Sequence, residues 1–134
     1  METTEIINSL KNALAELRIA EMELNRPHED VVSMSVCFGA RNSLNSLLKT
    51  YLMSNNIDSA TSNNTKELLN QCLEFDNRFS TLDISSMMCN ELNHEGCDGK
   101  YCLSVSKVDE CVTLANQVKS IVLEKLKINE SEFN

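Results

Sequence analysis

The longest stretch of low charge in the chain runs from Val31 to Met53, and it constrains the fold more than any other segment. Only Arg41 and Lys49 in it are charged. Its apolar residues recur at steps of three and four, which predicts an α-helix with one wide apolar face. They are Val31, Met34, Val36, Phe38, Leu44, Leu47, Leu48, Tyr51 and Leu52. A helix of this kind is typical of the centre of a helical bundle.

Three further segments have a helical period. Residues 2–25, 65–77 and 106–127 each carry an apolar stripe at the same spacing. Pro27 ends the first segment, because it disfavours the α conformation in the residue before it. Asn64 and Glu67 resemble a capping box at the start of the third. Phe75 is expected to be buried with the stripe of that helix, and Gly39 predicts a close helix–helix crossing.

These segments predict an all-α, up-down antiparallel bundle of four to five helices. Residues 1–128 would form one domain and residues 129–134 a frayed acidic tail. Three glycines and one proline are few, which favours long helices with few connections. Residues 54–64 and 93–103 are the predicted loops, and residues 83–92 are compatible with a short helical piece.

Composition disfavours several classes of function. The net charge of −8 and the scattered basic residues disfavour a nucleic-acid partner, because phosphate contacts need clustered Lys and Arg. The N-terminal residues have charges throughout, unlike a signal peptide. No run of eighteen apolar residues predicts a membrane span. We therefore expect a cytoplasmic protein whose six cysteines are reduced thiols.

The cysteines divide into two groups. Cys37, Cys72 and Cys111 fall on apolar helix faces, which predicts that they are core residues. The other group, with one histidine, lies in a loop region and could complete a tetrahedral zinc site. Its members are Cys89, His94, Cys97 and Cys102. The CxxC spacing of small structural zinc sites is absent, so ordinary thiols are the main prediction, and we expect no metal or other cofactor.

Arg41 is the most informative charged residue, because it sits inside the most apolar helix. A buried arginine needs a carboxylate partner or a bound anion. An ion pair with an acidic residue on a neighbouring helix is the main prediction. The alternative is a ligand-binding site made by Arg41, Asn45 and Lys49, which Lys100 and Tyr101 could join. His28 follows a proline and has no base or acid partner that predicts a catalytic role.

The order of these parts resembles a known family. The second helix has a face of small residues and a Leu-Leu-Lys run, and the third has the form Lys-Glu-Leu-Leu-Asn-Gln-Cys (66–72). A basic-Tyr pair and an apolar last helix follow. Besides 66–72, the matched positions are Ala40, Ser43, Leu44, Leu47, Leu48, Lys49, Lys100, Tyr101, Ala115, Val118, Ile121 and Val122. Over residues 5–126 this resembles the HEPN superfamily (higher eukaryotes and prokaryotes nucleotide-binding).

The resemblance implies a helical bundle that is often a homodimer. Many members are RNases or toxins with an arginine before a histidine, separated by four to six residues. Others bind nucleotides or assist a nucleotidyltransferase partner. Upstream of His28 and His94, none of the corresponding positions is an arginine. We therefore expect no catalytic residues and predict a binding or interaction module. It would form a homodimer, and it could bind a nucleotide or another protein. The alternatives are an RNase or toxin relative with a degenerate site, and a small zinc-dependent protein.

Overall fold

The computed structural model describes the chain apart from residues 1–2, 27–32, 58–63, 83–104, 130 and 132–134. The described part contains four α-helices and no strand. They are α1 (Thr3–Leu24), α2 (Ser33–Ser54), α3 (Thr65–Leu73) and α5 (Val105–Leu126), and a 3-10 helix, η2 (Asn77–Thr81), follows α3. The predicted all-α class is confirmed. The three long helices match their predicted ranges closely, while α3 is shorter than the predicted 65–77.

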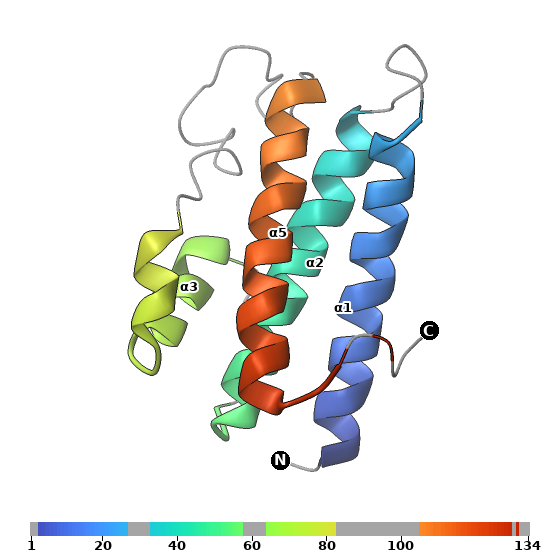
Figure 1. The fold of residues 1–134 in the computed structure, drawn as a ribbon. Coiled ribbons are helices and arrows are strands. Elements are labelled where there is room, and N and C mark those ends of the chain that lie inside the picture. Colours follow the sequence, from blue (N-terminus) through green and yellow to red (C-terminus); the bar gives the residue numbers. More distant parts are fainter. Residues whose placement is uncertain (1–2, 27–32, 58–63, 83–104, 130, 132–134) are drawn as a thin grey trace.

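The three long helices lie side by side, with α3 and η2 against one side of them (Figure 1). α1 and α2 are antiparallel, and polar contacts join them along their length. The buried Ser43 hydroxyl donates to the carbonyl oxygen of Ala13 at 2.9 Å. One turn earlier in α1, and nearer the C-terminal end of α2, the hydroxyl oxygens of Ser9 and Thr50 lie 2.6 Å apart. The predicted antiparallel pairing of the first two helices is confirmed.

Gly39 lies at a close approach of these two helices, as its sequence context predicts. A Cβ atom built on Gly39 would lie 3.2 Å from the Cβ of Ala20. That separation is tighter than ordinary van der Waals contact, so a larger residue here would push α1 away from α2. Ala40, next to Gly39, is fully buried. Small residues therefore set the distance between α1 and α2.

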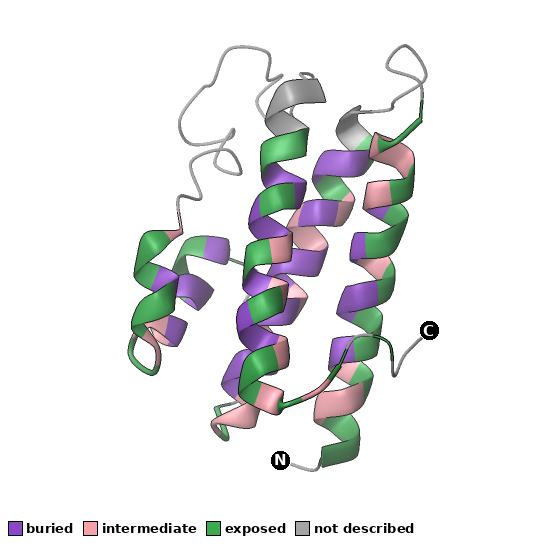
Figure 2. Cartoon of the chain, viewed as in Figure 1, coloured by how far each residue is buried: buried purple, intermediate pink, exposed green. Residues whose placement is uncertain are grey.

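α2 is the central helix, because its buried residues cover most of its circumference (Figure 2). The prediction from its hydrophobicity is confirmed for six apolar positions, and Ala40 and two polar residues, Ser43 and Thr50, are fully buried with them. The six are Val36, Leu44, Leu47, Leu48, Tyr51 and Leu52. Near the end of α2, the Tyr51 ring meets Phe79 edge to face at a centroid distance of 5.0 Å. This aromatic pair ties η2 to α2.

Two aromatic predictions are wrong. Phe38 was expected on the apolar face of α2 and is 54% exposed, and Phe75 was expected in the core and is 46% exposed. Phe38 lies between Cys37 and Gly39 on the part of α2 that turns away from Leu44. Phe75 lies after the last residue of α3, where the chain leaves the helix, so the helical period that would bury it no longer applies.

α3 departs from the predicted up-down alternation, because it runs in the same direction as α2. The Thr65 hydroxyl at its start donates to Asn45 Oδ1 at 2.6 Å. Further along, the Cys72 thiol lies 3.6 Å from the carbonyl oxygen of Leu48. The two helices therefore advance in the same direction, and the first residue of α3, Thr65, lies beside Asn45. The long α5 begins at the same end of the bundle as α2 (Figure 1).

Hydrogen bonds at the helix ends explain where several helices begin and stop. The predicted cap of α3 is confirmed in part: Asn64 Oδ1 accepts the Glu67 backbone N–H at 3.1 Å. α2 and α5 end differently, at the positive-φ residues Asn56 (63°) and Lys127 (58°). In each case the next N–H, that of Ile57 or Ile128, reaches back to a carbonyl five residues earlier at 2.9 or 3.0 Å. This is the Schellman arrangement, which glycine usually supplies.

The strained cap of α5 yields a stability prediction. Lys127→Gly should raise the free energy of unfolding by about 0.5–1 kcal/mol, because glycine adopts positive φ without steric cost. Lys125→Gly, two residues earlier within α5, should lower it by about 1 kcal/mol. Urea unfolding of both variants measures the difference. Equal destabilisation by both would contradict the proposed strain at Lys127.

Candidate functional site

The predicted ligand site centres on three residues of α2 at four-residue spacing, Arg41, Asn45 and Lys49. Four-residue steps bring them onto one side of the helix. Arg41 and Lys49 are half-buried there, and the Nε atom of Arg41 is shielded from solvent. Asn45 is 8% exposed and its Oδ1 accepts the Thr65 hydroxyl. Asn45 therefore anchors α3, which is a structural role that the sequence alone did not indicate.

The other two predicted ligand residues, Lys100 and Tyr101, lie outside the described residues. Their approach to Arg41 and Lys49 therefore stays a prediction. His28, the short helical piece at 83–92 and the residues of the alternative zinc site (Cys89, His94, Cys97 and Cys102) also lie outside the described residues. Within the described ranges, no group of three or more His, Cys, Asp or Glu side chains is arranged to hold a metal ion.

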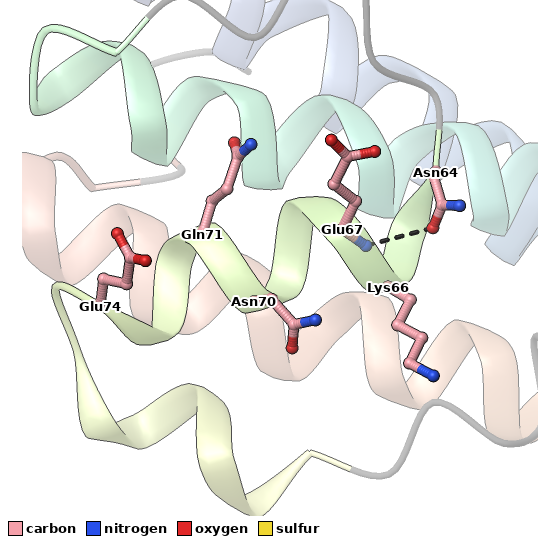
Figure 3. Close-up of a pocket in the computed structure, with 6 residues that line it drawn as sticks. All are labelled: Asn64, Lys66, Glu67, Asn70, Gln71 and Glu74. Atoms are coloured by element: carbon pink, nitrogen blue, oxygen red, sulfur yellow. Dashed lines mark hydrogen bonds between the residues drawn. The ribbon is translucent and has the colours of Figure 1, made fainter.

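Six polar residues between Asn64 and Glu74 line a shallow hollow along α3 (Figure 3). Glu67 and Gln71 extend toward α2, whereas Lys66 and Asn70 extend to the opposite side of α3. The two carboxylates of the hollow, Glu67 and Glu74, outnumber its one cation. Because these polar groups diverge instead of meeting at one point, the hollow offers no arrangement for catalysis.

The densest polar network among the described residues joins η2 to α2 and α5. Asp76 Oδ2 accepts a hydrogen bond from Arg78 Nη2 at 2.7 Å, and Arg78 Nη1 bonds Glu124 of α5 at 2.7 Å. The Tyr51 hydroxyl donates to the same Asp76 oxygen at 3.4 Å. The hydrogen bond from Arg78 lowers the pKa of Asp76 to about 2. The guanidinium of Arg78 is therefore held between two carboxylates, Asp76 and Glu124.

The predicted core cysteines are confirmed, because Cys37, Cys72 and Cys111 are buried free thiols. Burial, with a smaller contribution from the charge of Asp76, raises the pKa of the Cys72 thiol to about 12. A thiol nucleophile or metal ligand must lose its proton. Cys72 therefore stays neutral at physiological pH and packs as a small apolar residue.

The most exposed large apolar side chains lie on α1, where sequence reasoning missed them. Ile19 is 68% exposed and Met22 is 67% exposed, and they point away from the stripe formed by Leu10, Leu14 and Leu17. They line a groove whose other wall includes Gly39 of α2. The full lining is Ile19, Ala20, Met22, Glu23, Arg26, Ser35 and Gly39. The available signal was that neither Ile19 nor Met22 fits the apolar stripe of α1.

One ion pair borders this groove. Arg26 Nη1 lies 3.2 Å from the Glu23 carboxylate, one turn earlier. Two turns before Glu23 on α1, partial burial raises the pKa of the Glu16 carboxyl group. The groove therefore combines exposed apolar side chains of α1 with the Glu23–Arg26 ion pair.

Comparison of the chain with known protein families, with curated proteins and with solved structures finds no match. The HEPN resemblance therefore stays a prediction. In the described part of the chain, no helix combines the length and apolar character that crossing a membrane requires.

The Asp76 network predicts how stability depends on pH. Because Arg78 lowers the pKa of Asp76 to about 2, the carboxylate is favoured in the folded state. Its contribution is complete above the unfolded pKa of about 4 and is lost as the pH falls through the folded value. Asp76→Asn should therefore lower the free energy of unfolding by about 1 kcal/mol at pH 7 and by less at pH 3. The effect is small because the Asp76–Arg78 pair is partly exposed.

Thermal unfolding of Asp76→Asn and the unmodified chain at both pH values measures this effect. Glu124→Gln is the control, because the Glu124 side chain is 75% exposed and Arg78 keeps Asp76 as its main partner. If Asp76→Asn lowers the melting temperature equally at pH 7 and pH 3, its effect comes from packing and not from the charge of Asp76.

Proposed function

We propose that this chain is a non-catalytic, HEPN-like helical binding module that works as a homodimer through the outer face of α1. The observation that supports it most is the exposure of Ile19 and Met22 on one turn of that face. Single exposed apolar residues are common in soluble proteins. Two large ones at a spacing of three, beside a groove, expose apolar surface to water whose burial would favour association.

The position of α1 in the bundle supports the same proposal. Its buried residues pack in the bundle with α2 and α5, whereas Ile19 and Met22 are about two-thirds exposed at its edge. The exposed Ala15 continues this side one turn earlier. A second copy can therefore reach the surface without disturbing the core. Assistance to a nucleotidyltransferase-type protein, which the HEPN resemblance implies, would then use a dimer.

The homodimer is testable with charged substitutions on this face. The double variant Ile19→Lys, Met22→Lys should abolish concentration-dependent association measured by sedimentation velocity, because each lysine would place a charge in the apolar contact. Phe75→Lys is the matched control, since Phe75 is exposed elsewhere, after α3. An unmodified chain that stays monomeric at every concentration, or equal loss in the control, would refute the proposal.

A nucleotide ligand is the second candidate, and one observation favours it. Arg41 and Lys49 are two half-buried cations on one side of α2, and such cations suit a phosphate group. A bound nucleotide should raise the melting temperature of the unmodified chain. The shift should be lost in Arg41→Gln and kept in Lys66→Gln, an exposed cation on α3. No shift with ATP or GTP at millimolar concentration would eliminate this candidate.

A further inference from the structure

The outer side of α1 has the spacing of a coiled-coil seam. Asn12, Ala15, Ile19 and Met22 follow one another at steps of three, four and three, the a and d positions of a heptad. Ala15, Ile19 and Met22 are exposed, as is Asn12. The core stripe of α1 occupies the opposite side of the same helix, with Leu10 and Leu17 fully buried or nearly so. One helix thus carries two apolar seams, and the described residues cover only one of them.

Charges of opposite sign flank this outer seam. Glu16 and Glu23 lie on the flank beside α2: Glu23 lines the groove with Gly39, and the Glu16 carbonyl oxygen lies 3.8 Å from a Cβ built on Gly39. The other flank carries Lys11 and Arg18, both exposed. In heptad terms the acids occupy e positions and the bases g positions.

We infer that two copies of this chain pair through parallel α1 helices, with Ile19 and Met22 meeting their own counterparts and the basic flank of each copy facing the acidic flank of the other. This inference rests on the proposed homodimer and specifies its geometry. A second copy suits this face because its two flanks carry complementary charges. The charge pattern distinguishes the parallel from the antiparallel orientation.

Parallel and antiparallel pairing place these charges differently. In a parallel pair, each g residue faces the e residue five positions later in the other helix. Lys11 then faces Glu16 and Arg18 faces Glu23, twice over by the two-fold symmetry. In an antiparallel pair that stacks Ile19 on Met22, e residues face e residues, so Glu16 meets Glu23 and the two repel. Opposite charges therefore favour the parallel orientation.

The burial of Glu16 fits this orientation. Partial burial raises the pKa of its carboxyl group, so the charged form lacks the hydration it would have in open water. A lysine from the second copy would compensate for that loss. Glu23 already bonds Arg26, and Arg18 of the second copy would add to this pair.

The contact is small. Stable dimer interfaces bury about 1,200 Å² or more, and three apolar residues on one helix face bury less. Each copy also carries a net charge of −8, which opposes association. We therefore expect a weak, reversible dimer that must be measured at protein concentrations up to the millimolar range.

Orientation is tested with an introduced thiol. In a parallel pair, Ala15 lies opposite Ala15 of the other copy, within the Cα separation of about 4.4–6.8 Å that a disulfide allows. In the antiparallel pair, position 15 faces position 26, and the two introduced thiols would be about 16 Å apart along the axis. Ala15→Cys should therefore cross-link under mild oxidation several-fold faster than Thr113→Cys, an exposed position on α5.

Charge pairing is tested by mixing two variants. One carries Lys11→Glu with Arg18→Glu, and the other carries Glu16→Lys with Glu23→Lys. Each alone should lose the dimer seen for the unmodified chain in sedimentation velocity, because both flanks then have the same sign. An equimolar mixture should regain it. Circular dichroism confirms that each variant keeps its helices.

The outcomes separate the two proposals. An unmodified chain that never associates refutes the homodimer, and with it this inference. Association that depends on Ile19 and Met22, combined with Ala15→Cys cross-linking no faster than Thr113→Cys, keeps the homodimer and overturns the parallel geometry. Association of either charge variant alone, as strong as that of the unmodified chain, also overturns it. If a charge variant fails to fold, the cross-linking comparison decides.

Discussion

The close approach of α1 and α2 at Gly39 is the contact on which the rest of the structure depends. The absence of a Cβ on Gly39 lets the Ala20 side chain lie against the backbone of α2. At this short distance the Ser43 hydroxyl donates to the Ala13 carbonyl oxygen in the buried interface, a bond worth about 1 kcal/mol. The pairing also fixes which side of α1 is left outside. The exposure of Ile19 and Met22 is therefore a consequence of how α1 meets α2.

α2 is buried on so many sides that polar contacts must position its smaller neighbours. The hydrogen bond between Thr65 and Asn45 places the start of α3, and the Tyr51 ring places η2 through Phe79. A purely apolar contact would allow α3 to slide along α2, because hydrophobic attraction is not directional. A buried hydrogen bond does not permit this, since an unpaired buried group costs about 1–3 kcal/mol. Asn45 therefore has a structural role in positioning α3, whether or not Arg41 and Lys49 beside it bind a ligand.

The helices and most of the core could be predicted from the sequence, because a 3.6-residue period records which side of a helix is buried. The period no longer applies beyond a helix end, which explains why the exposure of Phe75 was not predicted. The period also does not indicate in which direction a helix runs, which explains why α3 was expected to be antiparallel to α2. The caps at Asn56 and Lys127 were missed because glycine is the usual signal for positive φ and neither residue is glycine. For the candidate site, the spacing of Arg41, Asn45 and Lys49 was informative, but the partner of Asn45 lies on another helix. Such a contact is not recorded in either local sequence.

The two surfaces considered for function place different demands on the chain. A phosphate site on α2 needs cations held in a fixed geometry, and the stiffness of a central helix suits this. An association surface on α1 needs apolar area that stays accessible, and a peripheral helix provides it. Ile19 and Met22 add nothing to the core, and exposed apolar groups lower solubility. The fold would form as well with polar residues at both positions, because the inner stripe of α1 already supplies its packing. The proposed homodimer would give both side chains a contact that the described part of the chain does not give them.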